Sequence, residues 1–318
     1  MRIAGIGSAT PKKVVTNEML SEFLETSDEW ITSRTGIRER RVLSDEKFEE
    51  LAAEAAGKAL ADAGISDGAV DLILCSTATS PYITPSLACV VRETLQLPCP
   101  AMDINAACAG FLYALDVADA YLRSGKVRKI LLICADNLSR IADWQDRSTC
   151  VLFGDAAAAL VLTDAGEDLR AILLRAEDNG TCLLAKNGTG SSPYLQYEEE
   201  MMPLHMEGQT VFKHAVASAQ EDISAVLLQA GMEQQEIDHF LLHQANIRIV
   251  DFIRKKMGLP LEKFDHNIEH YGNTSSASIP LLMDELYRSG RLKKGEKLLL
   301  NAFGAGFVSG ACVLEWNK

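Results

Sequence analysis

Two segments of this sequence recur at one fixed separation, and that repetition constrains the fold more than any other feature. AGISDGAVDLILC, which ends at Cys75, is matched by AGMEQQEIDHFLLH, which ends at His243. KILLICA begins at Lys129 and is matched by KLLLNAF at Lys297, and the offset in numbering, 297 − 129 = 168, equals 243 − 75. Two strands that share one offset indicate two duplicated halves, with chance agreement as the alternative. We place the boundary in TDAGEDL and expect halves at residues 1–165 and 166–318.

The order of apolar and amphipathic segments predicts an α/β fold. Short runs rich in Val, Ile, Leu and Ala, such as VDLILCST, RKILLICA and AAAALVLT, alternate with helical patterns such as FEELAAEAAGKALADAG. Continuous apolar runs are typical of strands covered by helices on both faces. The same offset carries Cys108 onto Ser276 in GNTSSAS, so a loop of each half would meet the other across a pseudo-twofold axis. Active sites often form at such junctions.

Composition excludes several classes of protein. A net charge of −13 argues against binding to nucleic acid, whose phosphates are neutralised by Lys and Arg. MRIAGIGSATPKK has no apolar core of signal-peptide length, and no stretch reaches the length of a membrane span. The eight cysteines mostly have apolar neighbours and no C-x-x-C spacing, which favours reduced thiols over disulfides or zinc. We expect a cytoplasmic protein without a metal.

Cys108 is the first candidate for chemistry. It lies among small residues in DINAACAGFLYALDVADAYL, just before Leu112, Leu115 and Ala118 at helical spacing. At a helix N-terminus the macrodipole and free N–H groups favour a thiolate, so we expect the thiol pKa to be lowered. The alternative is a small buried cysteine that packs a helix against a sheet.

Three further segments can place polar groups near Cys108. His243 follows the apolar run HFLL and should lie at the tip of a buried strand, where open α/β sheets carry catalytic groups. Asn273 in HYGNTSSAS precedes hydroxyl-bearing residues, which also suits a turn or cap. FGAGF at 303–307 follows the strand LLLNA and can present backbone N–H groups to a reacting carbonyl. Taken singly, a structural His, a capping Asn and a plain glycine turn are the alternatives.

Together these motifs resemble a known family. AACAGF, HQANIR, GNTSSAS and AFGAGF, with TSDEWITSRTGIRERR and DRSTCVLFGDAA, are similar in order and spacing to β-ketoacyl-acyl-carrier-protein synthase III over essentially the whole chain. The resemblance implies the five-layered αβαβα thiolase fold and a homodimer. It also implies an acyltransferase that condenses an acyl-CoA primer with malonyl-acyl-carrier protein to give 3-oxoacyl-acyl-carrier protein, initiating fatty acid biosynthesis. Coenzyme A thioester is then a substrate, and no cofactor is expected.

The resemblance also assigns roles to residues. It implies a catalytic triad of Cys108, His243 and Asn273, with the backbone N–H groups of Cys108 and Ala305 as the oxyanion hole. The role of Ala305 requires that its φ be negative. Coenzyme A adenine would lie between Trp30 and Arg147, with pantetheine along Phe212 and Asn246. Thr84 would reach across the dimer interface into the partner's acyl channel, and the alternative is that Leu87 or a residue of the 183–205 loop fills that space.

A docking surface for the acidic carrier protein is expected on the helix that starts near Asn246. Arg248, Lys255 and Lys256 share one face there, and Lys213 would join them. A solvated helix face is the alternative reading of the same spacing.

Three other functions fit part of the pattern. A condensing enzyme of secondary metabolism would use malonyl-CoA or a β-keto acid as acceptor. A cysteine hydrolase also uses Cys, His and Asn, and would release free acid. A non-catalytic binding protein is disfavoured by intact Cys108, His243 and Asn273. Ser148, and VSG at 308–310, depart from the commonest family pattern, which leaves the substrate open.

Overall fold

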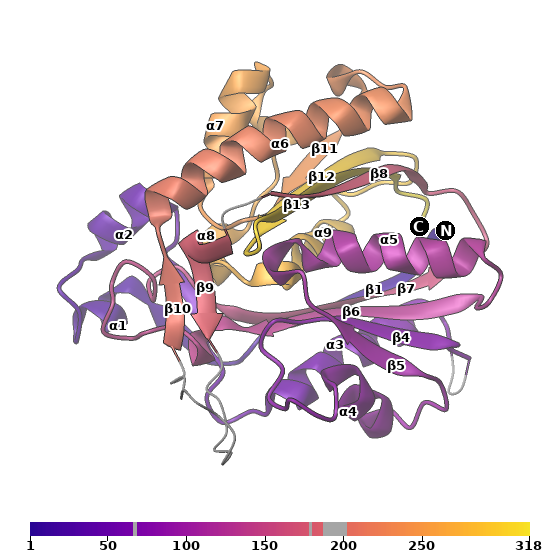
Figure 1. The fold of residues 1–318 in the computed structure, drawn as a ribbon, viewed down its shortest axis with the longest axis horizontal. Helices are drawn as coiled ribbons and strands as arrows, with labels where there is room; N and C mark the ends of the chain where they lie inside the picture. Colours follow the sequence, from indigo (N-terminus) through magenta and orange to yellow (C-terminus); the bar gives the residue numbers. More distant parts are fainter. Residues whose placement is uncertain (66–68, 178–179, 187–201) are drawn as a thin grey trace, which may run out of the picture.

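A computed structural model describes residues 1–65, 69–177, 180–186 and 202–318. Its elements stack in five layers (Figure 1). A central layer of helices α5 and α9 separates two sheets, and helices α3 and α4 cover one sheet while α6 and α7 cover the other. This αβαβα arrangement confirms the fold class expected from the sequence.

The first sheet contains the strands predicted from VDLILCST, RKILLICA and AAAALVLT. Its order is β1-β7-β6-β4-β5, where β4, β5 and β6 run parallel and β7 runs antiparallel to β1 and β6. The strands are β1 (Arg2–Ala9), β4 (Leu72–Ser76), β5 (Ala101–Ile104), β6 (Lys129–Asn137) and β7 (Asp155–Thr163). All residues of β6 after Lys129 are buried, as expected for a strand covered on both faces.

The second sheet has the order β11-β12-β13-β8. It consists of β8 (Leu169–Ala176), β11 (His239–Leu242), β12 (Lys297–Gly304) and β13 (Val308–Glu315). The helices that cover the two sheets are α3 (Phe48–Asp62), α4 (Leu87–Thr94), α5 (Gly110–Arg123), α6 (Gly208–Ala230), α7 (Ile247–Met257) and α9 (Ser278–Arg288).

Strand order shows the duplication directly. Reading β8-β13-β12-β11 against β1-β7-β6-β4 matches the two sheets strand by strand, and β6 and β12 begin at Lys129 and Lys297, the pair that defines the offset in the sequence. Helices α5 and α9 begin at Gly110 and Ser278, which are separated by the same offset. The chain crosses from one sheet to the other between β7 and β8. The domain limits at 165 and 166 fall in this crossing and stay a prediction.

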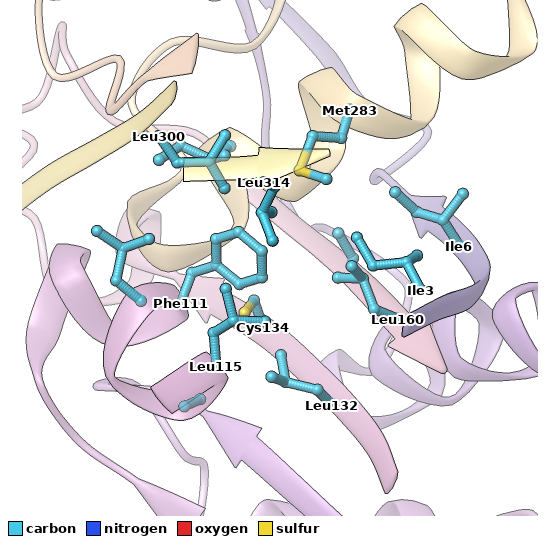
Figure 2. Packing of buried hydrophobic residues seen from close by; sticks show 14 of the residues in the cluster. Ile3, Ile6, Phe111, Leu115, Leu132, Cys134, Leu160, Met283, Leu300 and Leu314 are labelled. Atoms are coloured by element: carbon cyan, nitrogen blue, oxygen red, sulfur yellow. The ribbon is translucent and has the colours of Figure 1, made fainter. Parts of the chain in front are cut away.

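The central layer is held by apolar side chains from both halves. In Figure 2, Phe111 and Leu115 of α5 lie between Leu132 of β6 and Leu300 of β12, with Met283 of α9 beside Leu314 of β13. All of these side chains are almost fully buried, which contributes roughly 1.5–3 kcal/mol for each large apolar side chain removed from water. The start of α5 is therefore fixed between two rigid sheets.

Smaller elements complete the fold. They are the strands β2 (Val14–Thr16), β3 (Glu39–Arg41), β9 (Leu183–Lys186) and β10 (Met202–Met206), and the helices α1 (Asn17–Ser21), α2 (Asp28–Thr35) and α8 (Ile268–Tyr271). Strands β9 and β10 pair antiparallel beside the two sheets (Figure 1). In the described ranges, no helix combines the length and apolar character required to cross a membrane.

Candidate active site

Cys108 lies where the sequence predicts, at the entrance to a helix. It is the middle residue of a 3-10 turn, Ala107–Ala109, that leads directly into α5 at Gly110. Ala107 adopts a left-handed φ of 45°, and Ser275, its counterpart in the second half, adopts 54° in the equivalent turn Ser275–Ala277 before α9. Non-glycine residues avoid this region unless the surroundings enforce it. Each half therefore turns sharply at the same place, and both turns face the junction.

Gly304 allows the end of β12 to contact the nucleophile turn. A Cβ at this position would lie 2.8 Å from the backbone nitrogen of Cys108 and 3.0 Å from that of Ala109. Such a distance is too short for carbon against nitrogen, so only glycine fits. Ala305 follows in the connection between β12 and β13, and its φ is not positive, as its expected role requires. The sequence FGAGF thus brings its backbone against that of Cys108.

His243 directly follows β11 and is almost fully buried. Its backbone N–H donates to the Asn301 carbonyl at 2.8 Å, and its ring meets the Phe303 ring edge-on with centroids 5.3 Å apart. Nδ1 lies 2.8 Å from Ser278 Oγ, whereas Nε2 has no hydrogen-bond partner among the described residues. Burial lowers the pKa of His243 to about 3, so the ring is neutral at physiological pH.

Asn273 is held by the first half of the chain. Its backbone N–H donates to the Leu152 carbonyl at 2.8 Å, and its own carbonyl accepts from Gly154 at 3.0 Å. Its side-chain Oδ1 accepts from the Ser275 N–H at 2.8 Å. Because the oxygen is occupied by a donor, the amide NH₂ is the group left to donate to a ligand.

The expected lowering of the Cys108 pKa is wrong for this structure. Burial raises the pKa of the thiol to about 12, with the nearby Asp136 adding to the rise and a hydrogen bond from Ser275 opposing it. At pH 7 only about 10⁻⁵ of such a thiol is ionised. The resting pair is therefore a neutral thiol and a neutral imidazole.

Cys108, His243 and Asn273 line one cavity of about 360 Å³. Ser275, Gly304 and Ala305 line it as well. Its remaining wall is mostly apolar and comes from several elements: Leu138, Ile141, Phe153, Leu183, Leu184, Leu204, Met206, Val211 and Phe303. The structure thus brings together the predicted triad and the Ala305 backbone around an apolar space, which we call the inner cavity.

A second cavity, of about 610 Å³, contains most of the expected coenzyme A residues. Trp30, Phe212 and Asn246 line this outer cavity, together with Lys213 and Arg248. Met206 lines both cavities. The two spaces therefore adjoin at Met206.

Arg147 does not line the outer cavity, and it lies against Trp30 instead. Its guanidinium carbon is 5.1 Å from the centroid of the Trp30 ring, and Arg34 lies over the same ring at 4.6 Å. Arg147 also donates to the Glu25 carbonyl. A flat base between two stacking partners needs about 7 Å, twice a van der Waals contact. Adenine can enter between Trp30 and Arg147 only if Arg147 moves away.

The remaining predicted residues lie on the surface. Lys213, Arg248, Lys255 and Lys256 are exposed, and no carboxylate of the described residues forms an ion pair with any of them. Arg254 of the same helix does pair, with Asp251 at 3.5 Å. Thr84 is exposed and does not line the inner cavity of its own chain.

Sequence reasoning missed several residues of the site. Ser275 and Ser278 contact Asn273 and His243, and the strands β9 and β10 supply Leu183, Leu204 and Met206 to the cavity wall. The serines stand in GNTSSAS, where spacing from Asn273 was the available signal. The leucines carry no such signal, because β9 and β10 are short and belong to neither main sheet.

Comparisons with known proteins all point to one family. The C-terminal model of 3-oxoacyl-[acyl-carrier-protein (ACP)] synthase III matches residues 227–316, and the 3-oxoacyl-[acyl-carrier-protein (ACP)] synthase III model matches residues 102–180. The chain is 44% identical to β-ketoacyl-[acyl-carrier-protein] synthase III of Coxiella burnetii, covering 99% of this chain and 98% of that protein. It is 42% identical to the Xanthomonas axonopodis protein of the same name over the same shares. The crystal structure of the Aquifex aeolicus 3-oxoacyl-[acyl-carrier-protein] synthase III superposes with a TM-score of 0.91 at 41% identity, covering 99% of each chain.

Proposed function

This chain belongs to the 3-oxoacyl-[acyl-carrier-protein] synthase III family, and we propose that Cys108, His243 and Asn273 carry its reaction. It is an acyltransferase that condenses an acyl-CoA primer with malonyl-acyl-carrier protein, the initiating condensation of fatty acid biosynthesis. The observation that carries the residue assignment is the inner cavity, where the thiol, the unpartnered Nε2 and the amide of Asn273 line one apolar space.

The first half-reaction transfers the acyl group to Cys108. The sulfur attacks the thioester carbonyl, and the backbone N–H groups of Cys108 and Ala305 stabilise the oxyanion. Cys108 gives up one proton and the departing coenzyme A sulfur takes one up, so the transfer needs no net base. This balance suits a thiol whose pKa burial raises to about 12.

The second half-reaction uses the two donors. Malonyl-acyl-carrier protein loses CO₂, and the charge that develops on its thioester oxygen is stabilised by His243 Nε2–H and the Asn273 amide. A neutral imidazole suits this role, and the apolar wall strengthens both hydrogen bonds by excluding water. The resulting carbanion attacks the Cys108 thioester and releases 3-oxoacyl-acyl-carrier protein.

The test of this function is a product assay. The purified protein is incubated with an acyl-CoA and malonyl-acyl-carrier protein, and in parallel with malonyl-CoA as the acceptor. We expect 3-oxoacyl-acyl-carrier protein and CO₂ in equal amounts. Condensation with malonyl-CoA but not with malonyl-acyl-carrier protein would assign the chain to secondary metabolism. Release of free acid as fast as condensation would make it a hydrolase.

The outer cavity is our proposal for the coenzyme A site. Trp30 supplies a stacking face, Phe212 and Asn246 follow toward Met206, and Lys213 and Arg248 bring positive charge to a phosphate-bearing ligand. Asn246 Oδ1 accepts from the Arg248 N–H at 2.9 Å as the cap of α7, so its NH₂ is the group left for pantetheine. In this proposal Arg147 leaves the face of Trp30 when adenine enters.

The carrier protein is proposed to dock on the exposed cations around α7. Lys255 and Lys256 lie further along the helix than Arg248, outside the lining of the outer cavity. Changing both to Glu is expected to lower kcat/KM for malonyl-acyl-carrier protein about 10-fold or more at low salt, and less at high salt, because an acidic partner loses electrostatic steering. Acylation by acyl-CoA should change little, and stopped-flow rates at several salt concentrations measure both steps.

Lys293 and Lys294 provide a matched control. They are also adjacent and exposed, but they precede β12 at the end remote from Gly304. Changing both to Glu alters the net charge equally and should leave both steps unchanged. An equal effect of the two double variants would contradict docking at α7.

Thr84 is proposed to reach the acyl channel of a second copy. It stands beside Ile83, which is 95% exposed, and Tyr82, which is 45% exposed. Apolar side chains this exposed favour a covered surface, as in a homodimer. A small Thr would leave the channel open to longer primers, and each buried methylene contributes about 0.8 kcal/mol.

Thr84→Phe tests this role of Thr84. We expect the variant to lower kcat/KM for decanoyl-CoA and hexanoyl-CoA relative to acetyl-CoA by about 10-fold or more, because a bulky ring shortens the channel. Competition between the three thioesters gives the ratios. A wild type that strongly prefers acetyl-CoA, with the same profile in Thr84→Phe, would show that another side chain sets the length.

A further inference from the structure

The two nitrogens of His243 lie in different surroundings. Nδ1 is 2.8 Å from Ser278 Oγ, and Nε2 is buried with no partner among the described residues. Both residues are almost fully buried, each 2% exposed. A neutral ring carries one proton, and the nitrogen that holds it decides whether Nε2 donates or accepts.

Only one direction of the hydrogen bond between Ser278 Oγ and His243 Nδ1 gives the Ser278 hydroxyl proton an acceptor. It is the first residue of α9, and the described residues offer its hydroxyl a single hydrogen-bond contact, His243 Nδ1. If Nδ1–H donated to Oγ, the hydroxyl proton would be buried without an acceptor, which is costly. If Oγ–H donates to Nδ1, both groups are paired.

The surroundings of the ring favour the same direction. Burial is the one resolved cause of the lowered pKa of His243, and no carboxylate contributes. A carboxylate at Nδ1 would hold a proton there, as in acid–histidine pairs, whereas a serine hydroxyl can donate.

We propose that Ser278 is a positioning residue whose Oγ–H donates to His243 Nδ1 and thereby holds the ring proton on Nε2. The inference rests on the proposed function and deepens its second half-reaction. The electron pair of the breaking C–C bond moves toward the malonyl thioester oxygen, which accepts from Nε2–H and from the Asn273 amide. CO₂ leaves, the pair forms the new bond to the acyl carbon, and Cys108 departs as a thiolate that takes a proton from solvent.

One segment thus prepares both donors. Ser275 N–H occupies Asn273 Oδ1, and three residues later Ser278 occupies His243 Nδ1, so each catalytic side chain is left with its donor free. A further consequence is that Nε2, already protonated, is not the base for the Cys108 thiol. Acyl transfer should therefore not depend on Ser278.

Ser278→Ala and Ser278→Thr test the inference. With ¹⁵N-labelled histidine, long-range ¹H–¹⁵N spectra of the wild type should show His243 protonated at Nε2. In Ser278→Ala a fraction should carry the proton at Nδ1, and CO₂ release should fall about 10- to 100-fold, the loss typical when a group that orients a metal-bound His is removed. Acylation of Cys108 should stay within about twofold. Ser278→Thr keeps the hydroxyl and should restore both the Nε2 proton and most of the rate.

Ser218→Ala is the matched control, because this buried serine of α6 donates to the backbone carbonyl of His214 and not to a catalytic side chain. It should leave the His243 spectrum and both half-reactions unchanged. A wild-type proton on Nδ1 would overturn the inference, and so would a Ser278→Ala protein with unchanged spectrum and CO₂ release. Equal loss of both half-reactions with an unchanged spectrum would reduce Ser278 to a structural role. A wild type that forms no condensation product would refute the proposed function, while the spectrum would still report on Ser278.

Discussion

His243→Ala and Asn273→Ala are expected to accept an acyl group from acyl-CoA at close to the wild-type rate and to lose CO₂ release by about 10²–10³-fold each. Each variant removes one donor to the malonyl thioester oxygen, and the loss of one such donor costs about this much. Radiolabelled acyl-CoA measures the first step, and ¹⁴CO₂ from malonyl-acyl-carrier protein measures the second.

Cys108→Ala is the reference variant for distinguishing acylation from CO₂ release, because it should lose acylation altogether. The neutral thiol and neutral imidazole of the resting site support independence of the first step from His243. If His243→Ala slowed acylation as much as decarboxylation, the ring would be the base for Cys108 and not solely a donor to the malonyl thioester.

Gly304→Ala is expected to slow acylation of Cys108 by about 10²-fold. The added Cβ would lie 2.8 Å from the Cys108 nitrogen, so the nucleophile turn or the end of β12 must shift by several tenths of an ångström or more. A displacement of this kind misplaces both the sulfur and the N–H groups of the oxyanion hole, and an error of about 1 Å in such a site costs about this factor. Pre-steady-state labelling with acyl-CoA gives the rate.

Gly57→Ala is the control for this substitution. Gly57 lies within α3, and a Cβ there would meet no atom within 4 Å. Alanine favours a helix over glycine by roughly 0.5–1 kcal/mol, so this variant should be as stable as the wild type or more so, with normal acylation. Normal acylation in Gly304→Ala as well would show that close contact between β12 and Cys108 is not needed.

The sequence predicts the parts of the site that depend on local pattern and on the duplication. Apolar runs place β4, β6 and β7, and the constant offset between the halves places Ser276 opposite Cys108 before any coordinates are known. The strands and the opposition of Cys108 and Ser276 could be predicted because they depend on the local apolar pattern and on the repetition of the two halves.

The electrostatics of the site could not be predicted in this way. The helix-start position of Cys108 is local and suggests a lowered pKa, whereas the burial that raises it comes from segments distant in sequence, such as those that supply Phe303 and Leu204. The contact of Arg147 with Trp30 and the pairing of His243 with Ser278 likewise depend on how separate elements pack. Spacing along the chain carries no information about such contacts.

The most direct test of the central claim is mass spectrometry of the acylated protein. The wild type is incubated with one acyl-CoA, digested and mapped, and a second sample of the acylated protein is treated with malonyl-acyl-carrier protein before digestion. We predict one acyl group per chain, on the peptide that contains Cys108, and its disappearance from the second sample as 3-oxoacyl-acyl-carrier protein forms. An acyl group on another of the eight cysteines, or one on Cys108 that malonyl-acyl-carrier protein does not remove, would contradict the assignment of Cys108 as the nucleophile of the condensation.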